Sequence, residues 1–495
     1  MNNLIFLPAH QIAEMIRTRE VSAVEVLEAH LAQIYKQNSK LNAICTLDEE
    51  RARTTAKQSD EALARGENWG VLHGVPMTVK DVYETAGLRT TAGYKRLKNY
   101  VSTQDATVVQ RLRAAGAIII GKSNLAKLAS DYQSTNDLFE RVNNPWNLNC
   151  TAGGSSGGSA VAVATGIAPL EIGDDIGGSM RQPAHFCGVY SLKPTDRRIS
   201  TVGHIPEVPG QPKCIRYMLT PGCFARSIED LQLWFSLSLG TDSRQPDLAP
   251  VPLDTPSNKS LQNLKIAWTD GWKEIPVASS IQSAIKSFVD NLAQTGVYTE
   301  NWSPEKFDLG KTLQLYNLLV ALSMGYAKPW EVDDFLQVLP FMFKEATQGD
   351  KALRNLSNLS QLLPNLLNPN PKKYFEVLTE RDRIIAQLDV ALENWDVWLC
   401  PVACTTAFTH RAKGAAIEVD GRKIPYLLAS GAYTMPFAFT GHPVVVIPIG
   451  QDDTGLPIGI QIIGKRWKEM ELLSIVRQLV SVTQGFQIPP LVYTC

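Results

Sequence analysis

Residues 150–195 decide the fold, and they read CTAGGSSGGSAVAVATGIAPLEIGDDIGGSMRQPAHFCGVYSLKPT. Two glycine–serine segments stand out: residues 153–159 (GGSSGGS) and residues 175–179 (DIGGS). The first precedes a run of small apolar residues, 160–165, which favours a helix, and the second follows residues 168–172, which are typical of a short buried strand. We therefore expect the rest of the chain to support a site built from these two segments.

Three common glycine-rich sites do not fit the first segment. A phosphate-binding P-loop needs Lys-Ser/Thr after its last glycine, whereas Gly158 is followed by Ser159 and Ala160. A dinucleotide fingerprint needs a glycine at position 155, which is serine. The nucleophile elbow G-x-S-x-G matches residues 153–157, but residues 144–149 (NPWNLN) make a poor preceding strand.

Two serines and a distant lysine suggest a different arrangement. Gly177 and Gly178 let the backbone approach a substrate carbonyl, so consecutive N–H groups there are suited to bind an oxyanion. Ser179 would then be the nucleophile, which needs a base to remove its proton. Residues 74–81 read GVPMTVKD, and Lys80 ends the apolar, β-favouring part of this stretch. Burial would lower the pKa of Lys80 from about 10.4. Neighbouring strand residues face opposite sides, so Asp81 is not expected to neutralise Lys80.

These residues resemble the amidase signature family of serine hydrolases. The match covers residues 74–81 and, nearly unbroken, residues 153–195. The resemblance implies Ser179 as nucleophile, Ser155 as a bridging serine after a cis peptide bond, and Lys80 as base. The 24-position separation of the two serines (179 minus 155) is the one that the family pattern expects. It also implies an oxyanion hole formed by the backbone N–H groups of Ile176, Gly177, Gly178 and Ser179.

Supporting roles follow for neighbouring side chains. We expect Ser156 to hydrogen-bond near the catalytic set and Asp175 to brace the oxyanion hole, while Arg181 is assigned a structural role. One departure from the family pattern is Asp174, where a threonine is usual.

Two histidines leave alternatives open. His185, six positions after Ser179, keeps a Ser–His–Asp scheme open as an alternative. His204 is interpreted as a surface histidine, with a place at the rim of the site as the alternative.

The sequence predicts one α/β domain spanning residues 1–495, with a mixed, mostly parallel twisted sheet covered by helices on both faces. Within it we expect N-terminal helices at 1–70, a catalytic core at 71–240, a variable helical lid or insert at 304–368, and a C-terminal sheet and helix at 395–495. The glycine- and proline-rich residues 197–223 are interpreted as loop. Ser22 and Glu25 have the spacing of a helix capping box.

Composition describes an ordinary globular protein and gives no electrostatic case for nucleic acid or an anionic membrane as its main partner. The 48 basic and 49 acidic side chains give a net charge of −1, so nucleic acid is not expected as a partner. The eight cysteines show no zinc-type spacing, so we expect no metal and reduced thiols in the cytoplasm. No secretory signal or run of about 18 apolar residues is found, so no membrane span is expected, although peripheral membrane contact and a homodimer stay open.

The predicted reaction is hydrolysis of a carboxylic acid amide to the acid and ammonia or an amine, through an acyl-enzyme and without a cofactor. The substrate is a small amide. The apolar character of residues 304–368 favours apolar acyl or aryl amides, long-chain fatty amides among them. Two alternatives remain: the glutaminase (A) subunit of a tRNA-dependent amidotransferase, and a noncatalytic binding scaffold.

Overall fold

The structure is a computed structural model that describes residues 4–205, 213–248, 250–272, 274–327, 332–357 and 362–493. Its centre is an 11-stranded sheet in the order β1-β3-β2-β6-β8-β7-β14-β15-β11-β9-β10. The strands are β1 (Ile44–Leu47), β2 (Pro76–Lys80), β3 (Ile118–Ser123), β6 (Leu170–Asp175), β7 (Tyr190–Lys193), β8 (Thr220–Ala225), β9 (Lys265–Trp268), β10 (Tyr298–Asn301), β11 (Val397–Pro401), β14 (Val444–Gln451) and β15 (Pro457–Ile463). Two small hairpins lie outside it, β4–β5 (Thr135–Asn136 and Glu140–Arg141) and β12–β13 (Ile417–Val419 and Arg422–Ile424).

The sheet is mixed, as expected, but parallel pairs are in the minority. Only β3–β2, β2–β6, β11–β9 and β9–β10 run parallel. The central strands β6, β8, β7, β14, β15 and β11 pair antiparallel in succession, as do β1 and β3. β14 and β15 are joined by a short turn, which can only connect antiparallel strands. The expectation of a mostly parallel sheet is therefore wrong.

Helices cover both faces of the sheet. They are α1 (Ala9–Arg17), α2 (Ala23–Leu41), α3 (Glu49–Ala64), α4 (Thr107–Ala114), α5 (Gly157–Ala164), α6 (Arg181–Cys187), α7 (Ile228–Ser238), α8 (Ser279–Gln294), α9 (Leu309–Ala327), α10 (Val332–Thr347), α11 (Lys351–Ser357), α12 (Leu362–Leu367), α13 (Pro371–Ala391), α14 (Tyr426–Gly431), α15 (Met435–Thr440) and α16 (Glu469–Val480). The predicted capping box begins α2, where Ser22 accepts from the Glu25 N–H and the Glu25 carboxylate accepts from the Ser22 N–H.

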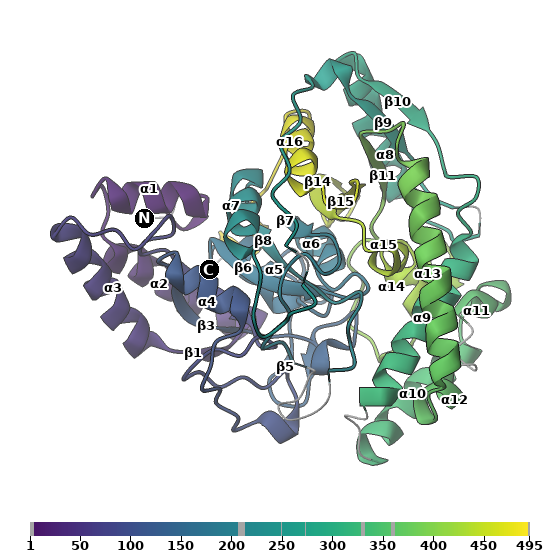
Figure 1. Ribbon diagram of the computed structural model, residues 1–495, viewed down its shortest axis with the longest axis horizontal. Coiled ribbons are helices and arrows are strands. Elements are labelled where there is room, and N and C mark those ends of the chain that lie inside the picture. The colour runs from purple at the N-terminus through teal and green to yellow at the C-terminus, as the bar shows by residue number, and fades with distance from the viewer. Residues whose placement is uncertain are drawn as a thin grey trace.

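The helices α9 to α13, which follow β10, form a group beside the sheet. Figure 1 shows α9 to α13, in green, gathered on the side of the molecule opposite α1 to α3. α9 contacts α11, α12, α13 and α15, and α15 precedes the central strand β14. Within the expected insert at 304–368, residues 328–331 and 358–361 lie outside the described residues. Among the described helices, none is both long enough and apolar enough to cross a membrane.

Two strands of the central sheet lie in segments that were expected to be loop or helix. β8 begins within residues 197–223, which were interpreted as loop because they are rich in glycine and proline. Gly222 is required for packing, because any side chain there would collide with the carbonyl oxygen of Leu192 on the neighbouring strand β7. β1 lies within residues 1–70, which were expected to be helical, and it forms one edge of the sheet.

Candidate active site

Lys80 is a fully buried lysine at the C-terminal end of β2. Its Nζ donates to Ser155 Oγ at 2.6 Å and to Ser156 Oγ at 2.8 Å, and it lies 2.5 Å from Asp174 Oδ1. Burial lowers the pKa of Lys80, and the negative charge of Asp174 offsets part of that fall. The carboxylate beside Lys80 is therefore that of Asp174, since Asp81 instead faces Lys122 at 4.0 Å.

Ser155 and Ser156 occupy the bend that leads into α5. The Gly154–Ser155 peptide bond is cis, as the family resemblance implies. The Ser156 N–H donates to the carbonyl oxygen of Ser179 at 3.1 Å, and the Gly154 N–H donates to Gln182 Oε1 at 3.2 Å. The first bond connects the two glycine–serine segments, and the second connects the first segment to α6, so both serine-containing segments are held at one site.

Asp175 organises the turn between β6 and α6. Its carboxylate accepts from the backbone N–H groups of Gly178 at 2.7 Å and Met180 at 3.1 Å, and pairs with both Nε and Nη2 of Arg181. Burial raises the pKa of Asp175, but the charge and hydrogen bonds of Arg181, together with weaker contributions, lower it by more, so the net pKa is below its usual value. Arg181 also donates to the carbonyl oxygen of Thr434 at 2.7 Å, in line with the structural role assigned to it.

The backbone N–H of Gly178 was expected to be part of the oxyanion hole, but it is engaged within the protein. Because its N–H already donates to Asp175, this group is not free to bind a ligand. Within the described residues, the N–H groups of Ile176, Gly177 and Ser179 make no hydrogen bond. Gly178 still has to be glycine, because its φ is 126° and a side chain there would collide with Thr434.

Side chains from outside both glycine–serine segments hold Gly177 in place. Tyr132 Oη and Thr434 Oγ1 both donate to the Gly177 carbonyl oxygen, at 2.7 and 2.6 Å. A carbonyl held in this way fixes the orientation of the peptide plane, and therefore the direction of the next N–H group along the chain. Sequence reasoning did not find Tyr132, because it carries no motif and reaches the site only through the tertiary fold. The stretch 433–441, which contains Thr434, was expected to lie at the edge of the site, with core packing as the alternative.

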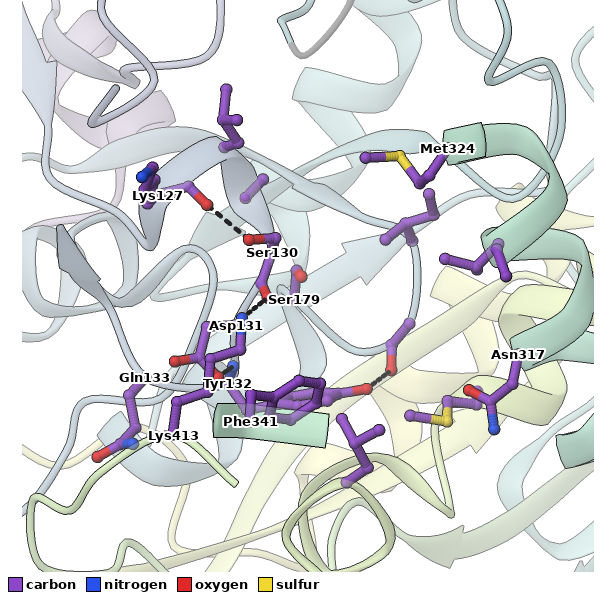
Figure 2. A pocket seen from close by; sticks show the side chains of 18 of the residues that line it. Lys127, Ser130, Asp131, Tyr132, Gln133, Ser179, Asn317, Met324, Phe341 and Lys413 are labelled. Atoms are coloured by element: carbon purple, nitrogen blue, oxygen red, sulfur yellow. Dashed lines mark hydrogen bonds between the residues drawn. The ribbon is translucent and has the colours of Figure 1, made fainter. Parts of the chain in front are cut away.

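A cavity of about 620 Å³ opens onto Ser179. Figure 2 shows Met324 and Asn317, from α9, on one side of it, and Asp131 and Tyr132 on the other. Most of its lining is apolar, including Ile215, Leu219, Val320, Met324, Phe341, Met342, Leu362, Leu366, Leu427 and Met435. The expected insert at 304–368 therefore contributes α9, part of α10 and α12 to the wall of the site.

The two histidines near the site differ in what they contact. The Nδ1 of His185 accepts the Gly459 N–H at 2.7 Å and its Nε2 contacts the Thr405 carbonyl oxygen at 3.2 Å, while burial lowers its pKa to about 4. Since both ring nitrogens are occupied by backbone groups, His185 is a poor candidate for activating Ser179. His204 is buried, lines the cavity and lies 3.5 Å from Asp174, so its interpretation as a surface histidine is wrong.

Replacing Arg181 with leucine should destabilise the fold strongly. The Asp175 carboxylate would stay buried without its main charge partner, and breaking a buried ion pair in this way costs about 3–5 kcal/mol. We expect a lower midpoint of chemical denaturation, measured by circular dichroism, with a smaller loss in Arg181→Lys. A midpoint unchanged in Arg181→Leu would show that the pair does not stabilise the turn.

Comparisons with known proteins match nearly the whole chain. The sequence model of the Amidase family matches residues 25–473. The A subunit of the Glutamyl-tRNA(Gln) amidotransferase of Carboxydothermus hydrogenoformans is 31% identical over 504 residues, covering 98% of this chain and 99% of that protein. A solved structure of 6-aminohexanoate cyclic dimer hydrolase with substrate is 25% identical, with a TM-score of 0.81 over 99% of both chains.

Fatty acid amide hydrolase shares the fold. Its solved structure is 20% identical, with a TM-score of 0.79 over 98% of this chain and 86% of that one. The family match extends over most of the sequence, and the structural matches reproduce the whole α/β architecture. The chain therefore belongs to the amidase signature family of hydrolases, which act on amide C–N bonds.

Proposed function

We propose that Ser179 is the nucleophile and that Ser155 and Lys80 move its proton. Ser179 Oγ attacks the amide carbonyl carbon while its proton passes to Ser155, which in turn gives its own proton to neutral Lys80. The proton then returns through Ser155 to the leaving nitrogen as the C–N bond breaks, and water later hydrolyses the acyl-enzyme. The observation that carries this proposal is the buried 2.6 Å contact between Lys80 and Ser155, next to a cavity that opens onto Ser179.

The surroundings of Lys80 and Ser179 support two of these steps, removal of the proton and formation of the tetrahedral intermediate. Burial lowers the pKa of Lys80, which favours the neutral amine that a base requires. The N–H groups of Ile176, Gly177 and Ser179, which make no other bond in the described chain, are suited to stabilise the negative oxygen of the tetrahedral intermediate. Asp175 and Ser156 support the site by holding the turn and the Lys80 amine.

The shape of the cavity supports an apolar acyl or aryl amide as substrate. Its walls are formed mainly by aliphatic, methionine and phenylalanine side chains, and about 620 Å³ is large enough for a drug-sized group. Burial of apolar surface contributes about 25 cal/mol per Å², so long or aromatic acyl groups gain binding energy that short ones lack.

Substrate preference provides the test. We expect kcat/KM to rise at least about tenfold from acetamide to an aromatic amide or a medium-chain fatty amide, because one well-buried side-chain-sized group contributes about 1.5–3 kcal/mol. Ammonia or amine release is measured for all three amides at equal concentration. The matched variant Met324→Asp places a charge in the wall and should reduce the preference. A preference for acetamide would contradict the apolar acyl site.

A glutaminase subunit is the second candidate, favoured by the full-length similarity to the amidotransferase protein of Carboxydothermus hydrogenoformans. This function predicts turnover of free glutamine and partner subunits that purify with the chain from its own cells. Glutamine turnover above that of every apolar amide, together with stoichiometric partner subunits, would favour this function over a free-standing amidase.

A further inference from the structure

Three groups surround the Lys80 amine, and their chemistry bears on its protonation state. Nζ lies 2.6 Å from Ser155 Oγ, 2.8 Å from Ser156 Oγ and 2.5 Å from Asp174 Oδ1. An ammonium group has three N–H donors, whereas a neutral amine has two donors and one lone pair. The two serine hydroxyls can accept from either form of the amine or donate to its lone pair, so they fit both forms. An ionised carboxylate can only accept, and its negative charge favours the ammonium, so the contact with Asp174 is the one that favours the charged form. The base proposed above, in contrast, must be neutral.

Asp174 depends on Lys80 for its own stability. Its side chain is 1% exposed, and neither carboxylate oxygen accepts a well-aligned hydrogen bond from the described residues. The nearest basic side chains are Lys80 and, at 3.5 Å, His204, which carries a charge only when it is protonated. Burial raises the pKa of Asp174, but Lys80 and His204 lower it by more, so the carboxyl group is ionised. A buried carboxylate with so few donors binds an adjacent ammonium strongly.

We propose that Asp174 is a positioning residue that keeps Lys80 protonated in the resting enzyme, so that the base becomes available only at a higher pH than the lysine and two serines alone would require. This inference rests on the proposed function, because it concerns the base of that mechanism. It assigns a role to the residue at which this chain departs from the usual family pattern.

Other charged groups face Lys80, but each is bound elsewhere. Glu171 accepts from Ser123 and Thr78, and Asp175 pairs with Arg181. The remaining groups on the packed elements are Asp81 after β2, Lys122 on β3 and His204 in the loop after β7, and Asp81 faces Lys122 and Thr91. Asp174 alone among these described groups lies within 3 Å of the amine.

The direction of the effect follows from the two opposing contributions at Lys80. Burial lowers its pKa, and the charge and hydrogen bond of Asp174 are the next largest influences, which raise it. Removing the Asp174 carboxylate removes the largest influence that raises the pKa of Lys80, so burial lowers this pKa further. The neutral fraction at a given pH then increases, and the rising part of the pH–rate profile moves to lower pH.

The test measures how fast a fluorophosphonate probe labels Ser179 between roughly pH 6 and pH 11, the range in which lysines with lowered pKa values titrate. It compares the unmodified protein with Asp174→Asn, which removes the charge at nearly constant shape, and Asp174→Thr. The opposite charge within 4 Å is expected to shift a pKa by 1–3 units, so both variants should move the rising limb down by at least about one pH unit. Labelling on that limb then becomes about tenfold faster at a fixed pH.

Glu171→Gln is the matched control, since it removes a second buried carboxyl group of β6 that does not touch Lys80. We expect it to move the limb clearly less than the Asp174 variants do. A rising limb that stays in place in either folded Asp174 variant, with only the maximal rate reduced, would overturn the inference and leave Asp174 a structural residue. Absence of labelling in the unmodified protein would instead contradict the proposed function.

Discussion

Replacing Ser179 with alanine is expected to lower kcat by roughly 10⁵-fold or more, because no other group would form the acyl-enzyme. The variant should bind substrate nearly as well as the parent, since only one oxygen is removed from a cavity with an apolar wall. The measurement is amide turnover, together with the mass of the protein after exposure to a fluorophosphonate. The parent should gain one probe mass, and Ser179→Ala should gain none.

Two further variants test whether the loss of turnover is specific to Ser179. Ser191→Ala removes another buried serine, on β7, and we expect turnover within a few-fold of the parent. Ser155→Ala removes the group between Lys80 and the nucleophile, and a lost proton-transfer group typically costs about 10²–10⁴-fold. If Ser179→Ala kept measurable labelling at one site, the nucleophile would lie elsewhere and the proposed mechanism would be wrong.

The sequence predicted the parts of this site that depend on local pattern. The run that ends in Lys80 forms β2, residues 160–164 lie in the helix α5, and the predicted strand at 168–172 overlaps the first half of β6. These segments combine strong hydrophobic runs with glycine at positions where the backbone bends. Local pattern does not show which segments meet, so the placement of Lys80 and Ser155 at one site came from the resemblance to the amidase signature family.

Contacts between distant segments could not be predicted. His204 looked like a surface residue in a loop, yet the chain folds it against Tyr83 and Asp174 at the base of the cavity. The hydrogen bond from Gly178 to Asp175 is local, but it depends on how the turn closes after β6. β8 was not predicted because proline and glycine, here Pro221 and Gly222, usually end strands. In the structure Gly222 is needed within the strand, because the carbonyl oxygen of Leu192 lies too close for any side chain.

Replacing Lys80 with methionine should abolish the pH-dependent part of the activity. Methionine keeps most of the length and apolar character of the lysine chain but cannot accept a proton. We expect kcat/KM to fall about 10²–10⁴-fold and the rising limb of the pH–rate profile to disappear. His185→Asn tests the competing Ser–His–Asp scheme: turnover lost there and retained in Lys80→Met would reverse the assignment of the base.

Loss of folding has to be separated from loss of the base in this variant. Lys80→Met leaves the Asp174 carboxylate buried beside a thioether, and an unpaired buried charge costs about 3–5 kcal/mol. The double variant Lys80→Met with Asp174→Asn removes both charges, so its denaturation midpoint should recover towards that of the parent. Its turnover should stay as low as in Lys80→Met, because stability returns without a base. Recovery of turnover together with stability would show that Lys80 acts only by neutralising Asp174.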